Sequence, residues 1–222
     1  MNILAVDTTT KKAQVAIKKG NDIFIKEIDN EITHSEKLLP LIDEVLKDAS
    51  LTLKDIDLYS CVLGPGSFTG VRIAIATIKA LAKVTNKEIF GITSLKLLAL
   101  NETSKIKDNS YVLSLIDAKH DRAYYELFKY KDGILKEQDY YGNDLIKNIQ
   151  QDLSSINEKE LTIITDNPTS IDESFPKDTY NIVCSLLNIK NALEFEEPNY
   201  TYLTLDAVYY RKSEAERTKF GE

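Results

Sequence analysis

A glycine-rich segment, Gly64–Gly70, has the residue types and spacing most suggestive of chemistry in this sequence. It joins an apolar run, Leu58–Leu63, to a helical run, Val71–Val84, and such a turn lets a backbone or an anion approach closely. The segment lacks the Lys-Ser/Thr ending with which a Walker loop neutralises phosphate. Ser67 is not spaced as a nucleophile elbow, because its neighbouring glycines are Gly66 and Gly70. A close packing turn and an anion site at free helix amides both remain open.

Other groups that could bind a metal or transfer a proton are few. The sequence has two histidines, His34 and His120, and neither is accompanied by a cluster of carboxylates. The two cysteines, Cys61 and Cys184, have no paired spacing and are expected to be buried reduced thiols. We therefore expect no metal site and no catalytic residue.

The composition limits the classes of partner. A chain of 222 residues with 43% hydrophobic content can bury one large core or two small ones. A formal net charge of -7 leaves no large basic surface for a nucleic-acid backbone, so any RNA contact would be local or shared. The first residues lack the pattern of a secretory signal, and no apolar stretch reaches membrane-spanning length. The expectation is a soluble cytoplasmic protein with no membrane partner.

One pattern of strands occurs twice. The apolar run Ile3–Val6 ends at Asp7 and is followed by a turn, an alternating strand, a glycine turn and a third strand; Val112–Ile116 and Asp117 begin the same series again. The recurrence predicts an α/β protein of two similar lobes with duplicated β-meanders, unless it is only the likeness of any two meanders. The expected lobes are residues 1–104 and 105–222. Further expected elements are a strand at 161–165 and helices at 144–153 and 183–193.

Two helices separate these repeats. Thr33 and Glu36 form a capping box, which predicts a helix start. At about 100° per residue, the second helix places Arg72, Lys79 and Lys83 on one narrow stripe, with apolar residues around most of the remaining circumference. Leaving a Val, Ile or Leu exposed forfeits roughly 1.5–3 kcal/mol relative to burial. This helix is therefore predicted to meet a second surface, either a partner protein or another part of the same chain.

Several segments resemble the TsaB (YeaZ) family. They are Ile3–Thr8, His34–Pro40, Gly64–Ile73 and Ser94–Ala99, with Asp117–Lys119 and Tyr209–Arg211 similar to later signatures. The resemblance implies a two-lobed fold of the actin-like ATPase superfamily, which includes sugar kinases and chaperone ATPases. It also implies a non-catalytic scaffold subunit of the complex that makes threonylcarbamoyladenosine beside the tRNA anticodon. The implied partners are a TsaD-like catalytic subunit, a TsaE-like ATPase and, through the complex, tRNA.

The resemblance also bears on the missing chemistry. The His-x-x-x-His metal motif of the catalytic relative falls on Ser94 and Leu98, which cannot replace imidazole ligands. In ATPases of the superfamily, a glycine in the first hairpin turn approaches the phosphate, whereas the corresponding turn here, Thr8–Lys12, has no glycine. Asp7 and Asp117 stand at the strand ends that lead into the phosphate-binding turns of those ATPases. No intrinsic cofactor is implied, and ATP or ADP at the partner interface stays open.

The two helices are expected to dock on the equivalent helices of the TsaD-like subunit, and the same face to form a homodimer when the chain is alone. The expected interface residues are Leu38, Leu39, Ile42, Arg72, Ile75, Ile78, Lys79 and Lys83. The competing hypothesis is an independent enzyme of the superfamily, a small-molecule kinase or a metallopeptidase. The chain departs from common family residues at Ala74, Ala80, Arg122 and Ala207.

Overall fold

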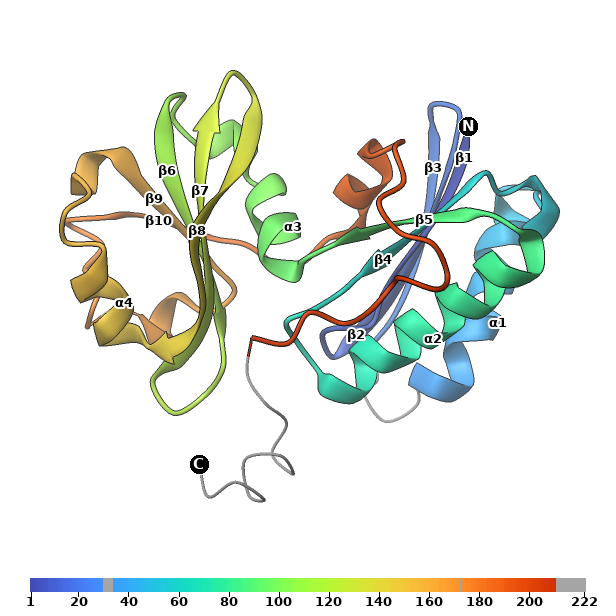
Figure 1. Ribbon diagram of the computed structural model, residues 1–222, viewed down its shortest axis with the longest axis horizontal. Coiled ribbons are helices and arrows are strands. Elements are labelled where there is room, and N and C mark those ends of the chain that lie inside the picture. The colour runs from blue at the N-terminus through green and yellow to red at the C-terminus, as the bar shows by residue number, and fades with distance from the viewer. Residues whose placement is uncertain (30–33, 172, 211–222) are drawn as a thin grey trace. The chain divides into compact units, whose positions relative to one another are not determined.

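The computed structural model describes residues 1–29, 34–171 and 173–210, and the chain divides into two compact units (Figure 1). Unit 1 contains Met1–Leu97 and Asn188–Val208. Unit 2 contains Leu98–Leu187 and resumes at Tyr209.

Unit 1 is built on a five-stranded sheet with the order β3-β2-β1-β4-β5. Its strands are β1 (Asn2–Asp7), β2 (Lys12–Lys19), β3 (Asp22–Asp29), β4 (Leu58–Val62) and β5 (Glu88–Ile92). The pairs β1–β2 and β2–β3 are antiparallel, whereas β1–β4 and β4–β5 are parallel. The central strands are continuous apolar runs because both faces of the sheet are covered.

Two long helices cover one face of this sheet, α1 (His34–Asp48) and α2 (Phe68–Thr85) (Figure 1). A short 3₁₀ helix, Leu53–Asp55, precedes β4, and α3 (Ser94–Leu100) follows β5. A 3₁₀ helix from late in the chain, Ile189–Glu194, packs on the opposite face against β1, β2 and β4. This late segment completes the core of unit 1.

Unit 2 repeats the plan of unit 1. Its sheet has the order β10-β9-β6-β7-β8, with β6–β7 and β7–β8 antiparallel and β6–β9 and β9–β10 parallel. The strands are β6 (Ser110–Asp117), β7 (Arg122–Lys131), β8 (Ile134–Leu145), β9 (Leu161–Thr165) and β10 (Asn181–Cys184). The helix α4 (Ile146–Asp152) packs on one face, and 3₁₀ helices form at Thr103–Lys105, Glu158–Glu160 and Pro168–Ser170.

The two sheets correspond strand for strand, β1 to β6 and onward to β5 and β10. Each has three antiparallel strands followed by two parallel strands on the side of the first strand. This duplication confirms the α/β, two-lobed actin-like fold.

Two expected elements in the second half of the chain were wrong in their limits or type. The strand at 161–165 is confirmed, but the expected helix at 144–153 begins only at Ile146, because Asp144 and Leu145 still pair with β7. The expected helix at 183–193 is instead the end of β10 followed by the 3₁₀ helix Ile189–Glu194. Pairing of Val183 and Cys184 with β9 overrides the helical pattern of that apolar run.

The observed division also differs from lobes of 1–104 and 105–222. The first boundary falls inside α3, between Leu97 and Leu98, and Asn188–Val208 belongs to unit 1 rather than to the second lobe. Burial of Ile189, Leu193 and Leu205 in unit 1 accounts for this return of the chain. The expected capping box at Thr33 lies outside the described residues.

Candidate docking site on the first unit

The glycine-rich turn lies directly against the turn between β1 and β2. A Cβ atom at Gly70 would overlap the carbonyl oxygen of Thr8, and one at Gly66 would lie 2.7 Å from Cβ of Thr9. The Ser67 amide donates to the Thr9 carbonyl at 2.7 Å, and the Thr8 hydroxyl donates to the Gly70 carbonyl at 2.6 Å. The glycines therefore allow two backbone turns to pack together, which supports the packing interpretation of this motif.

The start of α2 is capped from within the same turn. Ser67 is the N-cap residue, and its hydroxyl accepts a hydrogen bond from the Gly70 amide at 3.2 Å. The amides of Ser67 and Gly70 are thus both used inside the chain. The motif fixes where α2 begins and which of its faces meets the sheet.

The two strand-ending aspartates organise their own turns. The Asp7 carboxylate is buried and accepts a hydrogen bond from the Thr9 amide at 2.8 Å. In unit 2, Asp117 accepts from the Lys119 amide at 2.8 Å and from the Asn167 side chain at 3.0 Å. Among the residues the structure describes, no three His, Cys, Asp or Glu side chains come together as a metal-binding group.

A second aspartate adjoins Asp117. The Asp166 carboxylate accepts a hydrogen bond from the Asp117 amide at 3.0 Å. Burial raises the pKa of Asp166, with the neighbouring Asp117 carboxylate adding to the rise. Burial would also raise the pKa of Asp117, but the hydrogen bonds from Lys119 and Asn167 outweigh it and lower that pKa. The pKa of Asp166 is therefore raised and that of Asp117 lowered, although the two carboxyl groups are neighbours.

Most of the expected apolar anchors lie in the core rather than on a docking face. Leu38, Ile42, Ile75 and Ile78 are all buried in the core of unit 1. The chain itself already covers these four side chains, so the structure places them as core residues. Leu39 is different, with 54% of its surface exposed on α1.

A late segment, Asn199–Val208, supplies the second surface that α2 requires; we call it the strap (Figure 1). Leu205 of the strap is buried in the core of unit 1, and Tyr202, Ala207 and Val208 are partly buried against the same core. The Lys79 ammonium, expected at the border of a docking face, donates to the Leu205 carbonyl at 2.9 Å. The alternative that other parts of the same chain cover α2 is thereby confirmed for this side of the helix.

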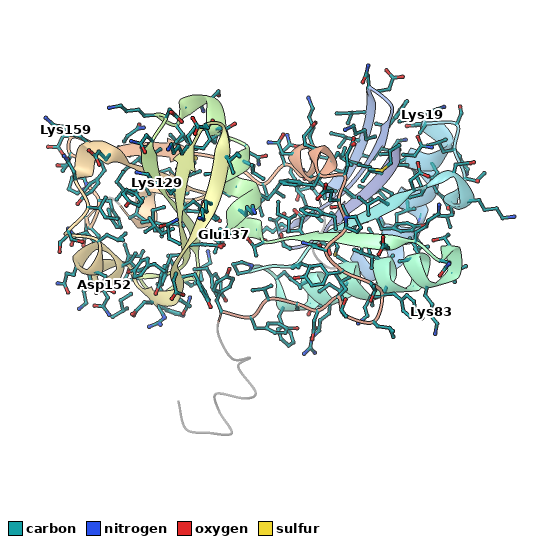
Figure 2. All side chains as sticks on the ribbon, turned by 45° about the horizontal axis from the view of Figure 1, so that its top comes forward. Lys19, Lys83, Lys129, Glu137, Asp152 and Lys159 are labelled. Atoms are coloured by element: carbon teal, nitrogen blue, oxygen red, sulfur yellow. The ribbon has the colours of Figure 1, made fainter. Side chains whose placement is uncertain are left out.

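One stripe of α2 remains exposed. Arg72, Ala76, Ala80 and Val84 follow one another at four-residue spacing, and Val84 is 84% exposed. The Arg72 guanidinium lies over the Phe68 ring, 3.9 Å from its centroid. Lys83 is exposed at the edge of this stripe (Figure 2), and its ammonium lies 6.0 Å from the centroid of the Tyr202 ring of the strap. We call Phe68, Arg72, Ala76, Ala80, Lys83 and Val84 the α2 stripe.

Of the α2 stripe, only Arg72 and Lys83 were among the expected interface residues; Phe68, Ala76, Ala80 and Val84 were not. Their spacing from the exposed Arg72, in steps of four residues, was the available signal, because residues four apart lie on one helix face. Of the two departures on this helix, Ala74 is buried in the core, whereas Ala80 lies on the stripe. Of these two alanines, only Ala80 therefore has its methyl group on an exposed face of the helix.

The two other residues that differ from common family residues, Arg122 and Ala207, lie outside α2. Arg122 donates to the side-chain and backbone oxygens of Asn143 at 3.0 and 2.9 Å, joining β7 to β8. Ala207 belongs to the strap.

The two positions that align with the metal histidines of the catalytic relative, Ser94 and Leu98, are both buried. The Ser94 amide donates a hydrogen bond to the Gly64 carbonyl at 2.8 Å. None of the helices in the described part of the chain is long and apolar enough to cross a membrane.

Comparison with known proteins agrees with this fold and motif. A family model described as TsaD, tRNA N6-adenosine threonylcarbamoyltransferase, matches residues 29–177. A tRNA threonylcarbamoyladenosine biosynthesis protein TsaB of Buchnera aphidicola (Schizaphis graminum) is 36% identical over 55% of this chain and 58% of its own. The Haemophilus influenzae TsaB is 32% identical, with 56% and 52% covered. The chain thus spans little more than half the length of these relatives.

Two solved structures share the fold. A Pseudomonas aeruginosa protein described as similar to peptidase YeaZ aligns with a TM-score of 0.78 and 22% identity, covering 95% of this chain and 99% of that one. YeaZ from the same organism aligns with a TM-score of 0.75 and 21% identity, covering 94% and 99%.

The fold and the packed glycine turn define a two-unit actin-like protein in which the turn positions a helix. Within that class, the chain belongs to the TsaB (YeaZ) family, inside the wider family described by the TsaD model.

Proposed function

We propose that this chain is a docking subunit in the formation of threonylcarbamoyladenosine in tRNA. It binds a TsaD-like catalytic subunit, works with a TsaE-like ATPase and reaches tRNA through the assembled complex. The names of its relatives motivate the pathway. The observation that carries the docking role is the α2 stripe, an exposed face with apolar members on a helix whose other sides are already covered.

The proposed contact consists of the α2 stripe together with Leu39 of α1. Small side chains at Ala76 and Ala80 let a partner helix approach closely, and Phe68 and Val84 offer apolar area at the two ends. Arg72 and Lys83 place positive charge along the same face. A partner helix with apolar and acidic residues complements this face.

The proposed subunit is non-catalytic. Ser94 and Leu98 stand at the positions of the catalytic relative's metal-binding histidines. Both side chains are buried, and neither has an imidazole nitrogen that could bind a metal. The glycine turn packs on Thr8 and Thr9, which supports a positioning role for that motif. ATP or ADP would bind, if at all, at the interface with the partner.

The direct test mixes the purified chain with a TsaD-like protein and follows the mixture by size-exclusion chromatography. Co-elution at an earlier volume than either protein alone is expected. Separate elution at micromolar concentrations, with steady nucleotide turnover by the isolated chain, would instead favour an independent enzyme. Light scattering of the chain alone tests the second part of the proposal, a homodimer through the same face.

A further inference from the structure

The strap, Asn199–Val208, is attached to the rest of unit 1 at a few defined points. Near its start, the Asn199 side chain accepts from the Gly91 amide at 2.7 Å and donates to the Gly91 carbonyl at 3.0 Å. Tyr200 exchanges two backbone hydrogen bonds of 2.9 Å with Ile89. These contacts occupy the edge of β5, which is the last strand of its sheet.

Two further attachments hold the other end of the strap. Lys79 of α2 donates to the Leu205 carbonyl at 2.9 Å, and the Val208 amide donates to the Leu63 carbonyl at 2.9 Å. Leu205 itself is 1% exposed, whereas Leu203, two residues earlier, is 76% exposed. A single fully buried side chain thus anchors the middle of the segment.

This attachment is sparse compared with that of the neighbouring strands. Each interior strand of the sheet has a hydrogen-bonded partner on both sides, but the strap pairs with β5 only at an isolated bridge. Thr201, Leu203, Thr204 and Asp206 of the strap are exposed. Segments with few buried contacts open locally at a lower free energy than the sheet that they cover.

We propose that the strap is a lid that opens as a separate unit while the sheet of unit 1 stays folded. Opening breaks the contacts to Gly91, Lys79 and Leu63 and withdraws Leu205 from the core. It exposes the edge of β5 and the part of α2 around Lys79.

Native-state hydrogen exchange tests this proposal on the whole chain. The amides of Tyr200 and Val208, which donate to Ile89 and Leu63 outside the strap, are expected to exchange at least tenfold faster than those of β1, after correction for intrinsic rates. Their rates should also rise less steeply with urea, because local opening exposes less surface than global unfolding. Strap amides with the same rates and urea dependence as β1 would overturn the proposal.

Two matched pairs of variants test the attachment points. Leu205→Ala is expected to raise the opening equilibrium about tenfold or more, since removing a buried leucine weakens the closed state, and the exposed Leu203→Ala should leave it unchanged. Lys79→Met should speed exchange at Val208, with Lys159→Met, at an exposed lysine of unit 2, as its control. Equal effects of Leu205→Ala and Leu203→Ala would contradict the lid, and the unmodified chain decides the question if Leu205→Ala does not fold.

Discussion

Asp7 and Asp117 occupy equivalent positions in the two units and make the same local bond. Each ends the first strand of its sheet, and each carboxylate accepts a hydrogen bond at 2.8 Å from the amide two residues later. Side chains of this type commonly close a turn in this way. The duplicated aspartates therefore have the same turn-closing role in the two units.

The proposed docking face predicts that a leucine-to-glutamate substitution weakens partner binding on α1 but not at an exposed leucine of unit 2. Leu39→Glu places a charge in the contact and should weaken binding to a TsaD-like subunit by tenfold or more. Leu186→Glu, at a leucine 73% exposed in unit 2, is the matched control and should bind normally. Calorimetric titration measures both. Equal affinities for the two variants would move the interface away from α1.

Ala80 offers a test of close approach by a partner helix. Ala80→Leu adds bulk on the α2 stripe and should weaken complex formation, while the unfolding free energy changes by less than about 0.5 kcal/mol because the position is exposed. Chemical denaturation and co-elution are measured on the same sample. Complex formation as strong as that of the unmodified chain would exclude Ala80 from the contact.

The buried residues of α2 predict the opposite behaviour. Ile78→Ala should lower the unfolding free energy by roughly 2–5 kcal/mol, because it leaves a cavity in the core of unit 1. The folded fraction should still bind the partner with unchanged affinity. A stable Ile78→Ala protein with weakened binding would return this residue to the interface.

Replacing Gly70 with alanine is predicted to destabilise the protein, although replacing a helical glycine with alanine usually stabilises one. Replacing a helical glycine with alanine normally stabilises a protein, but Gly70→Ala should destabilise it by about 1–3 kcal/mol through overlap with the Thr8 carbonyl. Ala76→Gly, at an exposed position of the same helix, should destabilise by about 0.5–1 kcal/mol for the ordinary reason. Urea unfolding measures both, and a stabilised Gly70→Ala protein would contradict the close packing.

Asp166 predicts a pH dependence of stability. Burial raises the pKa of its carboxyl in the folded state, so the folded chain holds this proton more tightly than the unfolded chain. The unfolding free energy should therefore fall as the pH rises from about the ordinary aspartate pKa through the raised value. Asp166→Asn keeps an oxygen to accept from the Asp117 amide and should lose that fall. Parallel pH profiles of the two proteins between pH 4 and 8 would refute this role of Asp166.

The sequence predicted the repeated strands well because their signals are local. Apolar runs such as Ile3–Val6 and Val112–Ile116, each ending at an aspartate, sufficed to place β1 and β6. The run from Val183 to Leu193 misled because a short apolar segment fits a helix or a strand, and its partner β9 decided between them.

The interface residues were harder to predict for a different reason. The excess of apolar residues on α2 correctly indicated a second surface, but that surface comes from Leu205, more than one hundred residues later. No local pattern connects Lys79 with the carbonyl of Leu205. Burial of Ile75 and Ile78 follows from this distant pairing and from packing on the sheet.

The return of Asn188–Val208 to unit 1 also governs how the protein can be divided. Neither unit is a continuous stretch of the gene, so no single cut separates them. A fragment that stops after β5 would lack the residues that cover α2 and one face of the sheet, and it should aggregate through those surfaces. Loss of partner binding on deleting residues from 188 onward would therefore not locate the binding site in those residues, because the deletion also uncovers α2.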